Sequence, residues 1–194
     1  MPPVRVAVLA SGDGTNLQVL LDTLGPDAPA HVVRVVTNRA DAGALERARQ
    51  AGIPTTVLRD SADATELQAA LADADLVVLA GYLRLVPRDV VTRFRHRLIN
   101  IHPALLPAFG GPGMYGRRVH EAVLASGATV SGATVHYVDE QYDRGPIIAQ
   151  RRVPVRPDDT PDTLAERVLA AEHELLPEVV TDLARKFRHT GVIQ

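Results

Sequence analysis

The stretch LINIHPALLP, from Leu98 to Pro107, indicates both the type of fold and the place of its site. Its apolar residues predict a buried strand, yet Asn100 and His102 insert an amide and an imidazole into it. Residues two apart on a strand project to the same side, so both side chains can face one point. Pro103 disfavours a helical conformation for His102, so the strand should end there. Ligands bind at this carboxyl edge in open α/β sheets.

Before this stretch, short apolar runs alternate with segments of helical periodicity. We predict strands at 4–10, 31–37, 53–58, 76–80 and 98–101, and helices at 17–24, 42–52, 63–71 and 87–94. Gly52 suits a helix end, Asp63 with Glu66 resembles a capping box, and Pro87 suits a first helical turn. The unbroken alternation is typical of a Rossmann-like α/β fold, an open, mostly parallel sheet with helices on both faces.

After this stretch the pattern changes. Residues 109–116 (FGGPGMYG) predict a loop, and a helix follows at 118–126. Strands at 130–138 and 147–155 are too close for a helical crossover, so they should pair antiparallel or lie at the sheet's margin. Thr160 and Pro161 begin a last helix with an apolar stripe, which Pro177 should kink or divide. We expect a surface tail at 190–194. The residues of the stripe are Leu164, Val168, Ala171, Leu175 and Val179.

Composition limits the possible functions. The 194 residues suit one domain, 1–194, and a net charge of −2 without a basic patch argues against nucleic-acid or membrane partners. No apolar run approaches the roughly 20 residues of a membrane span, and the start lacks signal-peptide features. Cysteine is absent and Lys186 is the single lysine, which excludes thiolate and most lysine chemistry. We expect a cytoplasmic protein, monomer or homodimer, that binds small molecules and no metal.

The loop SGDGTN, between the first strand and the first helix, is where such a fold binds anions. Amides at a helix start and the helix dipole favour negative charge. The third glycine of a dinucleotide motif is missing, so a phosphate site made by Gly14, Thr15 and Asn16 is better supported. The alternative is a tight turn in which Asn16 only caps the helix.

Asn100 and His102 together offer two hydrogen-bond donors to one oxygen, as a tetrahedral intermediate of acyl transfer requires. The alternative is a buried structural histidine. A carboxylate should orient the imidazole and favour its charged form. Asp139, Glu140 and Asp143 are candidates, although acids in a turn are usually solvated, and composition does not choose among them. Since no nucleophile elbow is present, direct transfer to a bound amine fits better than an acyl-enzyme.

Several motifs resemble the folate-dependent formyltransferases, in particular the phosphoribosylglycinamide formyltransferase (glycinamide ribonucleotide transformylase) branch. They cover nearly the whole chain in order, and the Asn-x-His-Pro motif with a late Asp is shared by the whole family. The first loop, the length and the C-terminal Glu-His-x-x-x-Pro favour the glycinamide ribonucleotide branch. The matching segments are SGDGTNLQ (11–18), ADAGALERARQAGIPT (40–55), VVLAGYLRLV (77–86), LINIHPALLPAF (98–109), GATVHYVDEQYDRGPIIAQ (132–150) and AERVLAAEHELLP (165–177).

The resemblance implies a role for each matching residue. Asn100, His102 and Asp143 are the catalytic set, with Asn100 also contacting the folate. Glu172 contacts the glycinamide end, and His136 is either a site residue or structural. The implied phosphate site is Gly14, Thr15 and Asn16, and the implied folate-binding loop is Leu83, Arg84, Leu85 and Val86.

Three features depart from the family pattern. Arg144-Gly145 stands where Gly-Gly is frequent, so the loop beside Asp143 can differ in shape. The family pattern places a basic residue that contacts the folate after the third strand, and only Arg59 lies near that position. The loop 109–116 is longer than in some relatives and can change how the site is covered.

The resemblance implies an enzyme that transfers the formyl group of 10-formyltetrahydrofolate, a co-substrate, to the amine of 5-phosphoribosylglycinamide in purine biosynthesis. Asn100 and a protonated His102 would stabilise the oxyanion, and Asp143 would keep His102 charged. One alternative is a formyltetrahydrofolate hydrolase (deformylase) with the same residues, although such relatives usually carry an extra N-terminal domain. Others are a non-catalytic nucleotide-binding module, and a transformylase acting on initiator tRNA or a sugar nucleotide.

Overall fold

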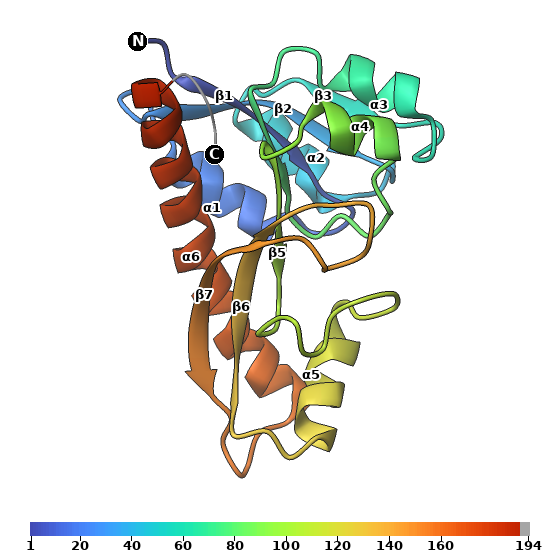
Figure 1. The fold of residues 1–194 in the computed structure, drawn as a ribbon, viewed down its shortest axis with the longest axis vertical. Coiled ribbons are helices and arrows are strands. Elements are labelled where there is room, and N and C mark those ends of the chain that lie inside the picture. The colour runs from blue at the N-terminus through green and yellow to red at the C-terminus, as the bar shows by residue number, and fades with distance from the viewer. Residues whose placement is uncertain (191–194) are drawn as a thin grey trace.

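The computed structural model describes the chain from Met1 to Thr190, the last residue by its backbone only. Its centre is a seven-stranded sheet with the order β3-β2-β1-β4-β5-β6-β7 (Figure 1). The strands are β1 (Val4–Leu9), β2 (Ala30–Thr37), β3 (Thr55–Val57), β4 (Leu76–Leu79), β5 (Leu98–His102), β6 (Val130–Tyr137) and β7 (Ile147–Pro154). The helices are α1 (Thr15–Thr23), α2 (Gly43–Gln50), α3 (Ala64–Ala70), α4 (Arg88–Arg93), α5 (Arg117–Ala125) and α6 (Pro161–Thr190).

The strands pair as the sequence pattern predicts. β1 to β5 run parallel, and β4 is buried along its whole length, as its continuous apolar sequence requires. β6 pairs antiparallel with β5, and β7 pairs antiparallel with β6 at the margin of the sheet. The short connection between β6 and β7 leaves no room for a crossover helix, which explains the change of direction.

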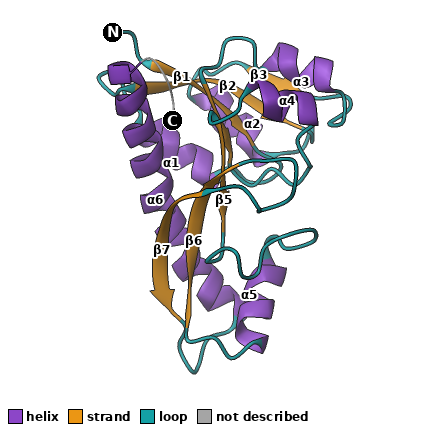
Figure 2. Ribbon diagram, in the orientation of Figure 1, coloured by secondary structure: helices purple, strands orange, loops and turns teal. Residues whose placement is uncertain are grey.

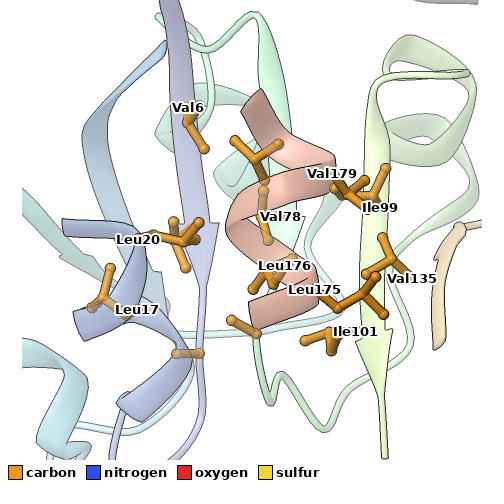
Figure 3. Close-up of a cluster of buried hydrophobic side chains, with 14 of the residues drawn as sticks. Val6, Leu17, Leu20, Val78, Ile99, Ile101, Val135, Leu175, Leu176 and Val179 are labelled. Carbon is orange, nitrogen blue, oxygen red and sulfur yellow. The ribbon is translucent and has the colours of Figure 1, made fainter. Parts of the chain in front are cut away.

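Helices cover both faces of the sheet (Figure 2). On one face, α1 and α6 pack against β1, β4, β5 and β6, with α2 and α5 adding to the same core (Figure 3). Leu17, Leu20 and Leu176 are completely buried there, and each such side chain contributes about 1.5–3 kcal/mol through apolar burial. On the other face, α3 and α4 bury Leu67 and Val90 in a second core. The predicted apolar stripe of α6 is buried throughout.

Several local predictions hold and some are wrong. Gly52 adopts a positive φ of 69° just after α2, as a helix-ending glycine does. Asp63 caps α3 by accepting bonds from two backbone amides, but the predicted capping box is incomplete. The Glu66 carboxylate instead accepts the amides of Arg59 and Asp60, because the chain folds back towards it after β3.

Pro177 does not divide the last helix, since α6 is one element of 30 residues with this proline inside it. Pro177 is buried, and the helix continues on both sides of it. The third strand is shorter than predicted, and Pro87 precedes α4 as its N-cap. The predicted tail beyond Thr190 lies outside the described residues.

The strand order places the loops of the site. β1 lies between β2 and β4, so the connection after β1 leads to one side and the connection after β4 to the other. A crevice forms at such a reversal, outside the carboxyl ends of the strands. The loop after β1 (10–14), the loop after β4 (80–87) and the end of β5 meet at this edge.

Candidate active site

A cavity of about 600 Å³ opens at the carboxyl ends of β4 and β5. Its wall is contributed by the loop after β4, the loop 109–116, the β6–β7 connection and one side of α6. Most of the predicted site residues line it, so segments far apart in the sequence share one space. They are Asn16, Leu83, Arg84, Leu85, Val86, Asn100, His102, Asp143 and Glu172.

The end of β5 aims Asn100 and His102 into the cavity, as their spacing of two predicts. The antiparallel register places His136 of β6 opposite Asn100 and Thr134 opposite His102. The Asn100 amide nitrogen lies 3.1 Å from Nε2 of His136 and 3.4 Å from Oδ1 of Asp143. Its two hydrogens therefore face two acceptors, and the longer contact to Asp143 lies beyond the usual hydrogen-bond range.

Asp143 joins this pair from the connection between β6 and β7. Its backbone adopts a positive φ of 55°, which is uncommon for residues other than glycine. The backbone amide of Gly111 donates a hydrogen bond to Oδ2 of Asp143 at 2.9 Å. Gly145 must be glycine because a Cβ there would overlap the carbonyl oxygen of Tyr137. The departure Arg144-Gly145 therefore retains glycine where the backbone requires it.

His102 is 4% exposed and has a partner at each ring nitrogen. Nε2 lies 2.9 Å from the carbonyl oxygen of Phe109, and Nδ1 lies 3.5 Å from Oδ1 of Asp143. A carbonyl only accepts, so Nε2 carries a proton in this arrangement.

Two opposing effects set the pKa of His102. Burial lowers the pKa of His102, and the Asp143 carboxylate and the Phe109 carbonyl only partly oppose that effect. Asp143 therefore favours the charged form of His102, as expected, but desolvation outweighs this attraction and the net shift of the pKa of His102 is downward.

Asp143 itself is an anion. Burial raises its pKa, but the imidazoles of His136 and His102 and the amide of Gly111 lower it more, so the net shift is downward. His136 Nδ1 lies 2.8 Å from the carbonyl oxygen of Tyr137, and its Nε2 faces both the Asn100 amide nitrogen at 3.1 Å and Oδ1 of Asp143 at 3.6 Å. His136 thus belongs to the site as a neighbour of Asn100 and Asp143.

The loop after β1 packs tightly on α2. Gly14 begins α1 with a positive φ of 75°, and a Cβ there would lie 2.8 Å from Cα of Ala44. Within the described residues α1 has no side-chain cap, so the alternative role of Asn16 as a cap is wrong. Among the three predicted phosphate residues, Asn16 lines the cavity, whereas Gly14 and Thr15 are not part of its described wall.

Asn16 instead donates from Nδ2 to Oε2 of Glu172 at 2.7 Å, which joins α1 to α6. Both side chains are buried, and burial raises the pKa of Glu172 to about 7 although the bond from Asn16 opposes this. In the described part of the chain, Oδ1 of Asn16 is buried without a hydrogen-bond partner. An unsatisfied buried oxygen next to a titrating acid is suited to a polar ligand group.

The loop after β4 forms an apolar side of the cavity. Tyr82 and Val86 are buried and anchor it, while Leu83 and Leu85 are 44% and 45% exposed at the cavity. Arg59 does not reach this cavity, because its side chain pairs with Glu66 in a separate shallow depression beside α3. A folate contact by Arg59 is therefore not supported.

The loop 109–116 contacts two of the predicted catalytic residues directly, which the sequence pattern did not predict. The Phe109 carbonyl contacts His102, and the Gly111 amide contacts Asp143. These contacts use backbone groups that every residue has, so the side-chain pattern carries no signal for them. His120 of α5 was not predicted either: it lines the cavity, and burial, then nearby His102, lower its pKa.

The described residues contain no group of three or more His, Asp or Glu that could hold a metal ion. No helix within residues 1–190 has the length and hydrophobicity needed to span a bilayer.

The sheet order, the Asn-x-His motif at the end of β5 and the late aspartate are those that the resemblance to the folate-dependent formyltransferases implies. The sequence profile of the formyl transferase family matches residues 4–180, so the chain belongs to that family. A protein from Arabidopsis thaliana named phosphoribosylglycinamide formyltransferase, chloroplastic, is 45% identical over 201 residues, covering 97% of this chain and 69% of that protein. The phosphoribosylglycinamide formyltransferase of Haemophilus influenzae is 37% identical, covering 91% of this chain and 85% of that protein.

Solved structures agree with these relatives. The phosphoribosylglycinamide formyltransferase from Anaplasma phagocytophilum superposes with a TM-score of 0.88 at 39% identity, covering 95% of this chain and 89% of that one. The human trifunctional purine biosynthetic protein adenosine-3 is 42% identical over 182 residues, which is 18% of its length.

Proposed function

We propose that this chain transfers the formyl group of 10-formyltetrahydrofolate to the amine of 5-phosphoribosylglycinamide, a step of purine biosynthesis. The observation that carries the proposal is the convergence of Asn100, His102 and Asp143 on one cavity. That cavity has an apolar loop on one side and the Asn16–Glu172 pair among its other lining residues.

Each substrate has a suitable place in the cavity or beside it. The flat pterin of the folate suits the apolar loop of Leu83 to Val86, whose backbone can offer hydrogen bonds to the ring. The phosphate suits the start of α1, where the backbone amides after Gly14 and the helix dipole favour an anion. Glu172, once ionised, can attract the protonated amine of the acceptor. No metal is needed for this chemistry.

The catalytic roles follow from the contacts of each group. The bound ammonium group first gives up a proton, which the Glu172 carboxylate can accept, and the neutral amine then attacks the formyl carbon, whose carbonyl oxygen becomes an oxyanion. Asn100 can turn to this oxygen the hydrogen that makes the long contact with Asp143, and the Nε2–H of His102 can leave the Phe109 carbonyl for the same oxygen. Two donors held at the end of one strand, each giving up an existing contact for the oxyanion, lower the barrier by stabilising the charge that develops on this oxygen.

A proton must then leave the attacking amine. A neutral His102 can accept it at Nδ1 through a water molecule, and the anionic Asp143, 3.5 Å away, stabilises the imidazolium that forms. The tetrahedral intermediate then collapses: the carbonyl re-forms, the bond between the formyl carbon and the folate nitrogen breaks, and the proton passes to that nitrogen, which releases tetrahydrofolate and the formylated acceptor. In this proposal His102 begins neutral, in contrast to the charged form that was expected from the sequence.

A hydrolase using the same three residues is less well supported. Water as acceptor has no use for a phosphate-binding helix start or for a buried acid such as Glu172. The relatives from Arabidopsis thaliana and Haemophilus influenzae are also named for the transfer reaction. We further propose a cytoplasmic location and a monomer or homodimer without nucleic-acid or membrane partners, noting that the plant relatives are named chloroplastic.

The test is consumption of 10-formyltetrahydrofolate by the purified protein with and without phosphoribosylglycinamide. Turnover that depends on the acceptor, with formylated phosphoribosylglycinamide as product, is the expected result. Equal turnover in the absence of the acceptor would identify a hydrolase instead. If neither mixture consumes 10-formyltetrahydrofolate, both the transferase and the hydrolase assignments are overturned.

A further inference from the structure

Ser11 lies just after β1 and is 2% exposed. Its hydroxyl donates to Oδ1 of Asn38 at 2.6 Å and accepts the backbone amide of Leu83 at 3.1 Å. Its own backbone amide donates to the carbonyl of Gly81 at 3.0 Å. One buried side chain thus connects the segments that follow β1, β2 and β4.

The direction of these bonds follows from the chemistry of the partners. The amide of Leu83 can only donate, so the Ser11 oxygen accepts there. The hydroxyl hydrogen is given to Asn38, which turns the oxygen lone pair towards Leu83. An alanine at position 11 could make neither bond, and it would leave the Leu83 amide and the Asn38 oxygen without this partner.

The position of Ser11 gives these bonds a function. The segment before it belongs to the central strand, and the segment after it is the rest of the loop 10–14, which leads into α1. Leu83 belongs to the loop after β4, whose exposed side chains Leu83 and Leu85 receive little support from the core. Tyr82 and Val86 anchor the loop on either side of these residues, so the link to Ser11 fixes the backbone between the two anchors, at Leu83.

We propose that Ser11 is a positioning residue that holds the folate-binding loop against the phosphate-binding loop. This inference rests on the proposed function of the two loops. Ser11 contacts no reacting atom in this scheme; it acts through the backbone of Leu83, and Asn38 orients its hydroxyl. Loss of Ser11 should weaken folate binding and leave the chemical step at Asn100 and His102 intact.

The test compares Ser11→Ala with Asn38→Ala and with a control, Ser131→Ala. Ser131 is 1% exposed, and its hydroxyl has no hydrogen-bond partner in the described chain, so its loss removes a buried serine without breaking a bond. For Ser11→Ala we expect a KM for formyl-folate about 10-fold higher, as for one lost buried hydrogen bond, with kcat changed less than about 3-fold. Asn38→Ala should give a smaller rise, and Ser131→Ala none.

Hydrogen exchange of the Leu83 amide is the second readout and does not depend on the reaction. Faster exchange at Leu83 in folded Ser11→Ala, together with the raised KM, supports the proposal. Unchanged exchange at Leu83, or a fall in kcat with an unchanged KM, overturns it. If Ser11→Ala does not fold, Asn38→Ala is judged by the same two readouts. Absence of formyl transfer by the unmodified protein would refute the proposed function alone, while the exchange result would still decide whether the link exists.

Discussion

Asn16 of α1 donates a 2.7 Å hydrogen bond to Glu172 of α6, across 156 positions of sequence. The bond joins the first and last helices on one face of the sheet. Glu172 is 8% exposed, and burial raises its pKa to about 7, so this acid changes charge close to neutral pH. The pair can therefore influence both stability and the binding of a charged amine.

Glu172→Gln should stabilise the protein at high pH. Since the folded pKa is about 7 and the ordinary value is 4.5, the folded state holds the proton more tightly, and stability falls as pH rises between these values. The uncharged glutamine avoids this loss of stability. A pKa shift of this size corresponds to about 1–3 kcal/mol in the free energy of unfolding. Urea unfolding at pH 5 and pH 8 measures it. Equal pH dependence in both proteins would contradict the assignment to Glu172.

The same residue should affect use of the acceptor. The carboxylate form attracts the protonated amine, so kcat/KM for phosphoribosylglycinamide should rise as pH increases through about 7. Glu172→Gln should remove this rise and raise the acceptor KM by about tenfold, the loss of one charged contact. The KM for formyl-folate is the internal control and should stay within a factor of about 2.

His102→Ala and Asn100→Ala should each lower kcat by about 100- to 1,000-fold, the usual effect of removing one oxyanion donor. Both residues stand at the end of β5, where shortening a side chain opens towards the cavity. Unfolding midpoints measured alongside turnover separate lost catalysis from lost folding. Turnover near that of the unmodified protein in folded His102→Ala would refute the catalytic assignment.

The pH profile of kcat tests the charge of His102. Burial lowers the pKa of His102. If the neutral form is the active one, kcat should increase with pH in the range below pH 6.5 and stay level at higher pH. Asp143→Asn removes a charge that raises this pKa, so the rising limb should move to still lower pH while kcat falls. A kcat that declines as pH increases through 7 would instead favour a protonated His102. Saturating both substrates keeps the titration of Glu172 out of the measurement.

Gly145→Ala should disturb the Asp143 loop. The added Cβ would overlap the Tyr137 carbonyl oxygen, so the backbone must shift, at a cost of about 2 kcal/mol or more. Gly25→Ala is the matched control, since no described atom beyond its chain neighbours lies within 4 Å of the place a Cβ would take and its φ is not positive. Thermal unfolding and kcat should both fall for position 145 and stay level for position 25.

Much of the fold was predictable because it depends on local patterns. The apolar runs of β1, β4 and β5 and the stripe of α6 specify which residues face the core, and these were predicted within a few residues. The capping box failed at Glu66 because a partner from the chain before α3 took its carboxylate. Such a competition depends on the path of a loop, which no periodicity encodes.

The site was predictable in part. The spacing of Asn100 and His102 determined that both face one side of β5, since the period of a strand is two. The residues alone left Asp139, Glu140 and Asp143 open, and only the resemblance chose Asp143. The structure places Asp143 beside His102 through a positive φ and the amide of Gly111. Neither feature has a side-chain signature.

The sequence by itself determined an alternating α/β chain, the direction of Asn100 and His102, and a glycine-bearing turn before the first helix. Only the tertiary structure decided that Asp143 reaches His102, that Glu172 accepts from Asn16, and that burial lowers the pKa of His102. The physical reason is one of range. Periodicity and turn chemistry act between residues close in the chain, whereas burial and long-range contacts exist only once the strands have taken their order in the sheet.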